Sequence, residues 1–284
     1  MTTQKILLGI VTRNRSGLVS KAISSALAQR GCALRVAVVD DGSTDKTSKL
    51  AKQFPMIDWT HRWPSQGYMA ARNNWMASTD EDYFVSLDDD AWFLDGDEIS
   101  VALEFLQSNP LVAAIAFDIL SPERHTPSPR LAPRPAAAFV GCGHVLRLAA
   151  VRSVGVYEAF PGSYGGEEKD LCLRLLDAGY GVVILPGVHV WHERTSVGRN
   201  SVEQHRSSVC NDLVSTLRRA PAILLPAAFL VKCYQHFRFS WKQGLTLPCL
   251  EGFRLFLRSL RQSWRSRRPV KASTLRQFMR LSRQ

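Results

Sequence analysis

The sequence predicts an α/β protein with a central, mostly parallel sheet flanked by helices, followed by a basic helical C-terminal extension. Apolar runs alternate with segments of helical periodicity from the N-terminus to about residue 200. Such alternation is typical of parallel sheets whose strands are buried on both faces. The chain has 284 residues, 45% of them hydrophobic, which is enough for a sizeable core.

The expected elements follow one another with short connections. In the first part of the chain we expect strands at 6–11, 36–39, 58–62 and 83–87, and helices at 16–30, 44–54 and 67–77. Ser16 is the expected N-cap of the first helix. The next part adds helices at 97–108 and 167–178, and strands at 111–117, 136–148, 182–185 and 188–191. Residues 121–135 contain five prolines and are expected to form a loop long enough to act as a lid.

Polar clusters follow three of the expected strands, each at the strand's end. These clusters are Thr12-Arg13-Asn14, Asp40-Asp41 and Asp88-Asp89-Asp90. In open α/β sheets, ligands bind beyond the carboxyl ends of the strands. We therefore expect the three clusters to meet on one rim of the sheet.

The aspartate triplet at 88–90 indicates a metal site. Neighbouring carboxylates repel one another, and Mg²⁺ or Mn²⁺ would relieve this repulsion because hard cations prefer oxygen ligands. Mg²⁺ commonly binds one or two carboxylates together with substrate phosphates. The alternative is a solvated acidic turn, but the Ala91-Trp92-Phe93 segment that follows is not typical of a surface.

The ordered set of motifs resembles the GT-A fold family 2 glycosyltransferases over about residues 5–200. The set comprises strand-TRN, strand-DDGSTD, a helix with Gly67, Arg72 and Asn73, strand-DDD, and a distant GGEEKD segment. No single motif is specific, whereas the whole set at successive strand ends is. The resemblance implies a metal-dependent, inverting transfer of a hexosyl or deoxyhexosyl group from a nucleotide sugar to a hydroxyl acceptor.

The resemblance also implies roles for the rim residues. Donor nucleotide contacts are expected from Thr12, Arg13, Asn14, Asp40, Asp41, Gly67, Arg72, Asp88 and Asp89. Asp90 is the expected direct ligand of Mn²⁺ or Mg²⁺, with Asp88 beside it. The ion would neutralise the nucleoside diphosphate as it leaves. A helix cap is the competing interpretation of Asp40 and fits Asp45 better, and a surface ion pair is the competing interpretation of Arg72.

Acids after the paired glycines 165–166 are the expected acceptor-side groups. The position of the family's general base is occupied by Glu168, a Glu where Asp is usual, and one extra methylene changes the reach of the carboxylate. Asp170 is the second candidate, although it could pair with Arg174 instead. Glu167 could bind acceptor hydroxyls.

Two histidines near the end of the last expected strand are candidates for the metal shell. In related enzymes a histidine here can complete the shell, and His192, next to a polar turn, is the better candidate. Strand alternation places His189 on the opposite face from His192. A structural hydrogen bond is an equally weighted alternative for His192. We do not expect His125 or His144 to be ligands.

The positive charge is concentrated in the C-terminal region. Residues 232–284 hold thirteen Lys or Arg and one acid, a net charge of +12, whereas the whole chain carries +11. We therefore expect a catalytic domain at 1–215 and a basic extension at 216–284. In the extension, Arg254, Arg258, Arg261 and Arg265 accompany an apolar helical stripe of Leu250, Phe253, Leu257, Leu260 and Trp264.

This pattern fits docking to an anionic membrane surface, where a lipid-linked acceptor or another glycan would be met. Packing of the stripe on the catalytic domain is the alternative interpretation, with similar weight. Nucleic acid is not an expected partner, because no recognised module accompanies the charge.

Six scattered cysteines without a metal-binding spacing indicate reduced thiols in a cytoplasmic protein. The basic extension adds the expectation of peripheral contact with the inner face of the membrane. A role in polysaccharide biosynthesis is consistent with these expectations. The alternative functions are nucleotidyl transfer on a related α/β fold, and sugar-nucleotide binding or membrane scaffolding without catalysis.

Overall fold

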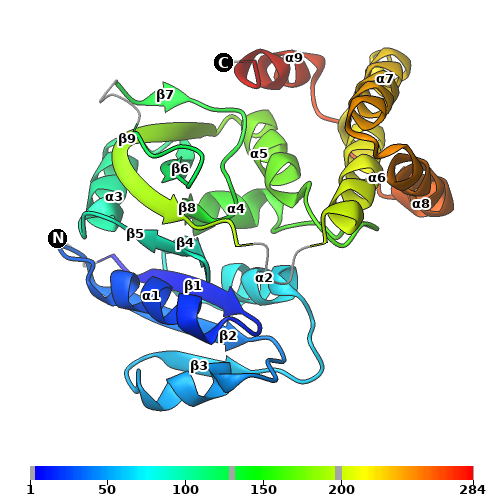
Figure 1. The fold of residues 1–284 in the computed structure, drawn as a ribbon. Coiled ribbons are helices and arrows are strands. Elements are labelled where there is room, and N and C mark those ends of the chain that lie inside the picture. Colours follow the sequence, from blue (N-terminus) through cyan, green and yellow to red (C-terminus); the bar gives the residue numbers. More distant parts are fainter. Residues whose placement is uncertain (1–3, 128–131, 196–199, 284) are drawn as a thin grey trace. The chain divides into compact units, whose positions relative to one another are not determined.

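A computed structural model describes residues 4–127, 132–195 and 200–283 (Figure 1). It confirms the α/β class, with a central sheet, flanking helices and a helical C-terminal region. The chain divides into two compact units. The first is Met1–Val156 with Ala178–Thr195, and the second is Tyr157–Asp177 with Ser196–Gln284.

The described residues of the first unit form a nine-stranded sheet. Its order is β3 (Asp58–His61), β2 (Leu34–Asp40), β1 (Ile6–Thr12), β4 (Tyr83–Asp88), β8 (Gly143–Arg147), β6 (Val112–Leu120), β9 (Gly181–His192) and β5 (Ala91–Phe93), with β7 (Arg134–Pro135) also pairing with β9. The run β3-β2-β1-β4 and the pair β6-β9 are parallel. Strands β8, β5 and β7 pair in the antiparallel sense, which the sequence did not predict.

Alternate side chains of β1 point to opposite faces of the sheet, and those on both faces are buried. Helices therefore cover both faces. Leu8 and Ile10 share a core with α1 (Ser16–Leu27) and α3 (Glu98–Ser108). On the other face, α2 (Tyr68–Ser78) brings Trp75 against Gly9, where a Cβ atom would lie 2.5 Å from the indole ring. Glycine at position 9 thus permits the close approach of α2. The short helix α4 (Leu148–Val154), also unpredicted, contacts α2.

Three local expectations are corrected by the structure. The segment expected as a helix at 44–54 is a 3-10 helix, η1 (Lys46–Lys52), and Asp45 caps it by accepting from the Thr47 N–H. Side chains that bond nearby backbone in this way compete with α-helix formation. Ser16 is the first residue of α1 and not its N-cap, which is Arg15.

The third correction concerns β9. The sequence predicted two short strands because Pro186 and Gly187 interrupt the apolar run, but the structure has one strand. Its pairing with β6 shifts register between Ala116 and Asp118, opposite this Pro-Gly step, and Gly187 adopts φ +87°. Residues 185–188 of β9 lie opposite the single residue 117 of β6, so a bulge absorbs the Pro-Gly step without ending the strand.

The second unit is helical. It contains α5 (Glu167–Asp177), α6 (Ser201–Arg219), α7 (Leu225–Gln243), α8 (Thr246–Arg265) and α9 (Ala272–Leu281). Helices α6 and α8 share a core of Val209, Cys210, Leu213, Val214, Leu217, Cys249 and Phe256. The sequence predicted a boundary between the catalytic domain and the basic extension after residue 215. This boundary falls inside α6, and the division of function between the two parts stays a prediction.

Among the described helices, none combines the length and apolar character that a bilayer crossing requires. All six cysteines are free thiols. The expected loop at 121–135 includes an isolated bridge between Ser121 and Arg124 and the short strand β7, while its residues 128–131 lie outside the described part of the chain.

Candidate functional site

The ends of β1, β2 and β4 bring the three polar clusters to one rim of the sheet. Thr12 pairs with Asp40 across β1 and β2, and Val11 pairs with Asp88 across β1 and β4. The Asp41 N–H also donates to the Thr12 carbonyl at 2.9 Å. The juxtaposition follows from parallel register, because parallel strands present their carboxyl ends at the same edge.

Two arginines compensate part of the charge of the aspartate triplet. Arg15 Nη1 lies 2.7 Å from Asp89 Oδ1 and 3.5 Å from Asp90 Oδ2, and Arg72 Nη2 lies 2.6 Å from Asp88 Oδ1. Protein cations thus relieve some of the repulsion that the sequence attributed to a metal. The three carboxylates differ in exposure, because the side chain of Asp88 is 30% exposed and that of Asp90 is fully buried.

Asp88, Asp90 and His192 form the candidate metal centre. One potential ligand atom from each lies within 4.8 Å of the other two, and His192 Nε2 is 3.2 Å from Asp90 Oδ1. The pairing of Ala91 with His192 between β5 and β9 places the imidazole next to the triplet. The two carboxylates suit Mn²⁺ or Mg²⁺, and the imidazole favours Mn²⁺, the softer of the two. The residues present therefore fit the expected ion.

Asp89 is a buried carboxyl paired with Arg15. Burial raises the pKa of Asp89 to about 6, against the lowering effect of the adjacent Arg15 guanidinium. The expected nucleotide contact of Asp89 and the choice of Asp90 as the direct ligand stay predictions.

The first two loops of the rim are connected through Asn14. Asn14 adopts φ +55°, and its Oδ1 accepts from the backbone N–H of Thr44 at 2.7 Å. Its own N–H donates to Ser43 Oγ at 2.9 Å. Asp45, besides capping η1, accepts from the Ser16 N–H at 3.4 Å. Asn14 thus shapes the loop, whereas Arg13 beside it is exposed.

The two aspartates after β2 are both buried but have different partners. Asp40 accepts from the Ser43 N–H at 2.9 Å, and its other oxygen lies 3.2 Å from His61 Nδ1. Asp41 accepts from the N–H groups of Gln66 and Gly67 at 2.9 and 2.8 Å. Asp41 therefore holds the loop that leads into α2.

The protonation of Asp41 reflects these contacts. Burial acts to raise its pKa, but the bonds from Gln66, Ser65 and Gly67, together with the Arg62 charge, lower it below its usual value. Gly67 itself is the N-cap of α2 with φ +83°, a conformation that glycine adopts without strain.

Arg72 is buried and faces the candidate metal centre. In addition to Asp88, Arg72 Nη2 contacts the Gly141 carbonyl at 3.3 Å, and its guanidinium carbon lies 5.1 Å from the centre of the Tyr68 ring. An ion pair does form, as in the competing interpretation, but with a member of the triplet and not on the surface. Arg72 can therefore orient Asp88.

The other histidines considered have structural partners. His189 lies on the opposite face of β9 from His192, as alternation predicted, and its Nδ1 is 2.9 Å from Asp95 Oδ2. His144 is fully buried, its Nδ1 lies 3.1 Å from the Val140 carbonyl, and its ring stacks on Phe139. Burial, with the nearby Arg72 charge, lowers the pKa of His144 to about 3.

The acceptor-side candidates all lie at the start of α5, in the second unit. Glu167 and Asp170 are buried, and Glu168 is partly exposed. Asp170 accepts from Arg174 Nε at 2.8 Å and from Arg219 Nε and Nη2 at 2.6 and 3.2 Å. With two guanidiniums on a fully buried carboxylate, Asp170 has a structural role that explains its presence.

The loop before α5 is held by one side chain of α6. Asn211 Oδ1 accepts from the Gly162 N–H at 2.8 Å, and Asn211 Nδ2 donates to the Gly165 carbonyl at 2.6 Å. Gly165 and Gly166 have φ of +80° and +105°, which explains the paired glycines before the acids. Asn211 thus fixes the entry into the helix that carries Glu168.

Sequence reasoning missed Arg15, Asn211 and Arg219. Arg15 directly follows the strand-end cluster at 12–14, so its position was a usable signal. Asn211 and Arg219 lie in a helix that the sequence analysis did not identify, more than forty residues from their partners. No local pattern indicated them.

A family model and curated relatives match part of the chain. Residues 8–140 match the model described as Glycosyl transferase family 2. A curated relative, an uncharacterized glycosyltransferase of Rickettsia conorii, is 32% identical over 111 residues. The matched segment covers 38% of this chain and 18% of that relative.

Solved structures share the fold at low sequence identity. TarS 1–349 of S. aureus, in complex with UDP-GlcNAc, gives a TM-score of 0.66 at 15% identity, covering 93% of this chain and 82% of that chain. The mannosyltransferase PcManGT of Pyrobaculum calidifontis, in complex with GDP-Man and Mn²⁺, gives 0.61 at 16% identity, covering 90% and 74%. These likenesses establish the fold of this chain.

Proposed function

We propose that this chain is a glycosyltransferase, since residues 8–140 match the model described as Glycosyl transferase family 2. The chain transfers a sugar from a nucleoside-diphosphate sugar to a hydroxyl acceptor, in a metal-dependent reaction that inverts the anomeric carbon. The observation that carries the proposal is the convergence of Asp88, Asp90 and His192 on the rim where β1, β2 and β4 end. Ligands of the fold neighbours, UDP-GlcNAc and GDP-Man with Mn²⁺, support a nucleotide-sugar donor.

On the donor side, the chain positions the nucleotide and the diphosphate. Asp88, Asp90 and His192 would hold a Mn²⁺ or Mg²⁺ ion, which when bound supplies positive charge to the leaving diphosphate. Arg72 holds Asp88, and Arg15 holds Asp89 and Asp90, so the carboxylates keep a fixed geometry. Thr12 and Asp40, paired across β1 and β2, would line the base and ribose pocket together with Asn14 and its loop.

On the acceptor side, Glu168 is the base. It takes the proton of the acceptor hydroxyl as the oxygen bonds to the anomeric carbon, while the bond from that carbon to the diphosphate oxygen breaks. The nucleoside diphosphate leaves with the electron pair of the broken bond. The salt-bridged Asp170 supports this assignment, because its carboxylate oxygens already accept hydrogen bonds from two guanidiniums.

The acceptor is a glycan or a lipid-linked sugar, met by a cytoplasmic protein at the inner face of a membrane. The basic extension supports this part of the proposal through its charge of +12 over residues 232–284. A role in polysaccharide biosynthesis would follow.

A donor-turnover assay tests the proposal. A panel of UDP- and GDP-sugars is incubated with the full chain in Mn²⁺ or in EDTA, and released nucleoside diphosphate is measured. We expect at least one donor to release nucleoside diphosphate in Mn²⁺ and not in EDTA. Nucleotide binding without turnover of any donor would favour the inactive binding protein, and release of pyrophosphate from a nucleoside triphosphate would favour the nucleotidyltransferase.

A further inference from the structure

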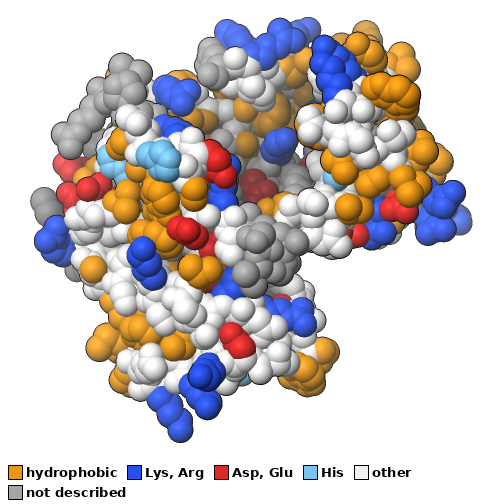
Figure 2. Space-filling model, viewed as in Figure 1, with side chains coloured by type: hydrophobic (Ala, Val, Ile, Leu, Met, Phe, Trp, Pro, Cys, Tyr) orange, Lys and Arg blue, Asp and Glu red, His pale blue; other side chains and the backbone are white. Residues whose placement is uncertain are grey.

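Helices α7 and α8 carry an exposed apolar face. On α7, the side chains of Leu230, Tyr234, Phe237 and Trp241 recur at helical spacing, and on α8 the face continues with Leu250, Leu257, Leu260 and Trp264. Their exposed fractions range from 40% for Leu260 to 70% for Trp241. Figure 2 shows hydrophobic side chains gathered over these two helices. Contiguous apolar surface of this kind marks an interaction site.

Helix α8 is packed by its other face. Cys249, Gly252, Phe256, Ser259 and Ser263 are its buried residues, and α6 is its main neighbour. A Cβ atom on Gly252 would lie 2.7 Å from the Arg206 carbonyl, so α8 approaches the backbone of α6 closely. Within the second unit, four residues of the apolar stripe predicted from the sequence are exposed, Leu250, Leu257, Leu260 and Trp264, whereas Phe253 packs partly against the core that α8 shares with α6.

Positive charge borders the apolar face on both helices. On α8, the arginines at 254, 258, 261 and 265 are exposed, and on α7 the exposed cations beside the face are Arg238 and Lys242. Glu251 is the single acid of the two helices. An apolar face with cationic margins complements a bilayer surface that bears anionic lipids.

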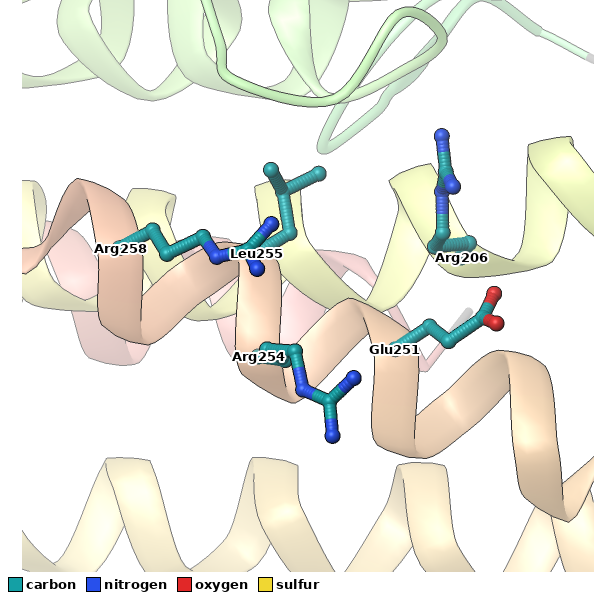
Figure 3. Close-up of a pocket in the computed structure, with 5 residues that line it drawn as sticks. All are labelled: Arg206, Glu251, Arg254, Leu255 and Arg258. Atoms are coloured by element: carbon teal, nitrogen blue, oxygen red, sulfur yellow. The ribbon is translucent and has the colours of Figure 1, made fainter.

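A basic pocket lies between α6 and α8 at the margin of this face (Figure 3). Its volume is about 290 Å³, and it is lined by Arg206, Glu251, Arg254, Leu255 and Arg258. Arg206 Nη2 is paired with Glu203 at 2.5 Å, whereas its buried Nε atom donates no hydrogen bond within the described part of the chain. Three arginines and one glutamate line the pocket, an excess of positive charge that favours an anion, and arginine donors match phosphate oxygens geometrically.

We propose that the apolar face of α7 and α8 enters the interfacial layer of an anionic membrane, and that the Arg206–Arg254–Arg258 pocket binds the phosphate of an anionic phospholipid headgroup. This inference deepens the membrane contact proposed above by assigning it a surface and a lipid-binding site. Leu250, Leu257 and Trp264 would lie among the acyl chains near the headgroups, and the pocket at the level of the lipid phosphates. The helices lie along the surface and do not cross it.

Vesicle flotation of the full chain tests the inference. We compare phosphatidylcholine vesicles with and without phosphatidylglycerol, and follow the emission of the exposed Trp241 and Trp264 as a second readout. Binding that requires phosphatidylglycerol, with a blue shift of the tryptophan emission, is expected. Equal binding to both vesicle types would overturn the assignment of an anionic headgroup.

Two charge-matched double variants separate the pocket from diffuse attraction. Arg254→Gln with Arg258→Gln removes pocket donors, and Arg261→Gln with Arg265→Gln removes the same charge from the same helix outside the pocket. Because charge-assisted hydrogen bonds are lost only in the first, we expect its vesicle affinity to fall about ten-fold more than that of the second. Equal losses would refute the pocket.

Leu257→Ser with Trp264→Ser tests the apolar face, and it should weaken binding to phosphatidylglycerol vesicles and reduce the blue shift of the remaining Trp241, while leaving thermal unfolding unchanged. Sedimentation without lipid tests a competing occupant of the face. If the wild type is a dimer and this variant is a monomer, a second copy of the chain covers the face and the inference fails. Donor turnover without vesicles keeps the two proposals distinct, because both arginine variants should retain it. Turnover without vesicle binding would reject the membrane site alone.

Discussion

Arg219 donates two hydrogen bonds to Asp170, from Nε to Oδ1 at 2.6 Å and from Nη2 to Oδ2 at 3.2 Å, and both side chains are almost completely buried. Arg219 Nη2 also pairs with Glu158 at 2.6 Å. The start of α5 is thereby fixed to the end of α6. A carboxylate in this position stabilises the fold, which leaves the partly exposed Glu168 as the candidate base.

Asp170→Asn should therefore act on stability. Removing one partner of a buried ion pair leaves the other charge uncompensated, so we expect a loss of about 3–5 kcal/mol in the free energy of unfolding, measured in urea. Glu168→Gln, two residues away on the same helix, is the matched control and should unfold like the wild type. Unchanged stability with lost transfer in Asp170→Asn would make Asp170 the base.

Glu168→Gln should act on catalysis alone. The amide cannot take a proton, and general base catalysis contributes about 10²–10⁴-fold, so transfer should fall by at least about 100-fold while donor affinity is retained. Calorimetric titration with the donor and a transfer assay measure the two quantities. Undiminished transfer would move the base to another acid of α5.

Asp90→Ala should abolish the metal-dependent part of donor binding. Asp90 is one of three potential ligands within 4.8 Å of one another, so its loss should bring the donor affinity in Mn²⁺ down to that in EDTA. Titration of the donor in both buffers gives the difference. Asp80→Ala, at an exposed position, is the control and should keep the metal effect. A wild-type metal effect in Asp90→Ala would reject the assignment.

His144 should make stability depend on pH. Its pKa is lowered from 6.5 to about 3 by burial, so between these values the unfolded chain binds one more proton than the folded protein. Stability present above pH 6.5 is then lost as the pH falls, by about 1.4 kcal/mol per pH unit for this group.

His144→Asn, which cannot titrate, should flatten the dependence between pH 6 and 4.5 in urea unfolding by about this slope. His125→Asn, at an exposed position, should leave the slope unchanged. An equal slope in the wild type and in His144→Asn would contradict the prediction.

The sequence could predict the parts of the fold and site that depend on local pattern. The buried runs of β1, β2 and β4, each ending in polar residues, were sufficient to predict one rim bearing Thr12, Asp40 and Asp88, because parallel strands align their carboxyl ends. The predicted set Asp88, Asp90 and His192 is also brought together. The sequence predicted two strands in place of β9, because the bulge that keeps them in one strand is visible only in the pairing of β9 with β6.

The tertiary structure alone decided which charges compensate one another and which faces are covered. Arg15, Arg72 and Arg219 reach their carboxylates over sequence separations that no periodicity records. The helical pattern of α8 defined an apolar stripe, but only the packing against α6 revealed that a different face, with Gly252 at its centre, is buried. Local sequence fixes what an element can present, whereas the partner that it meets depends on contacts distant in the chain.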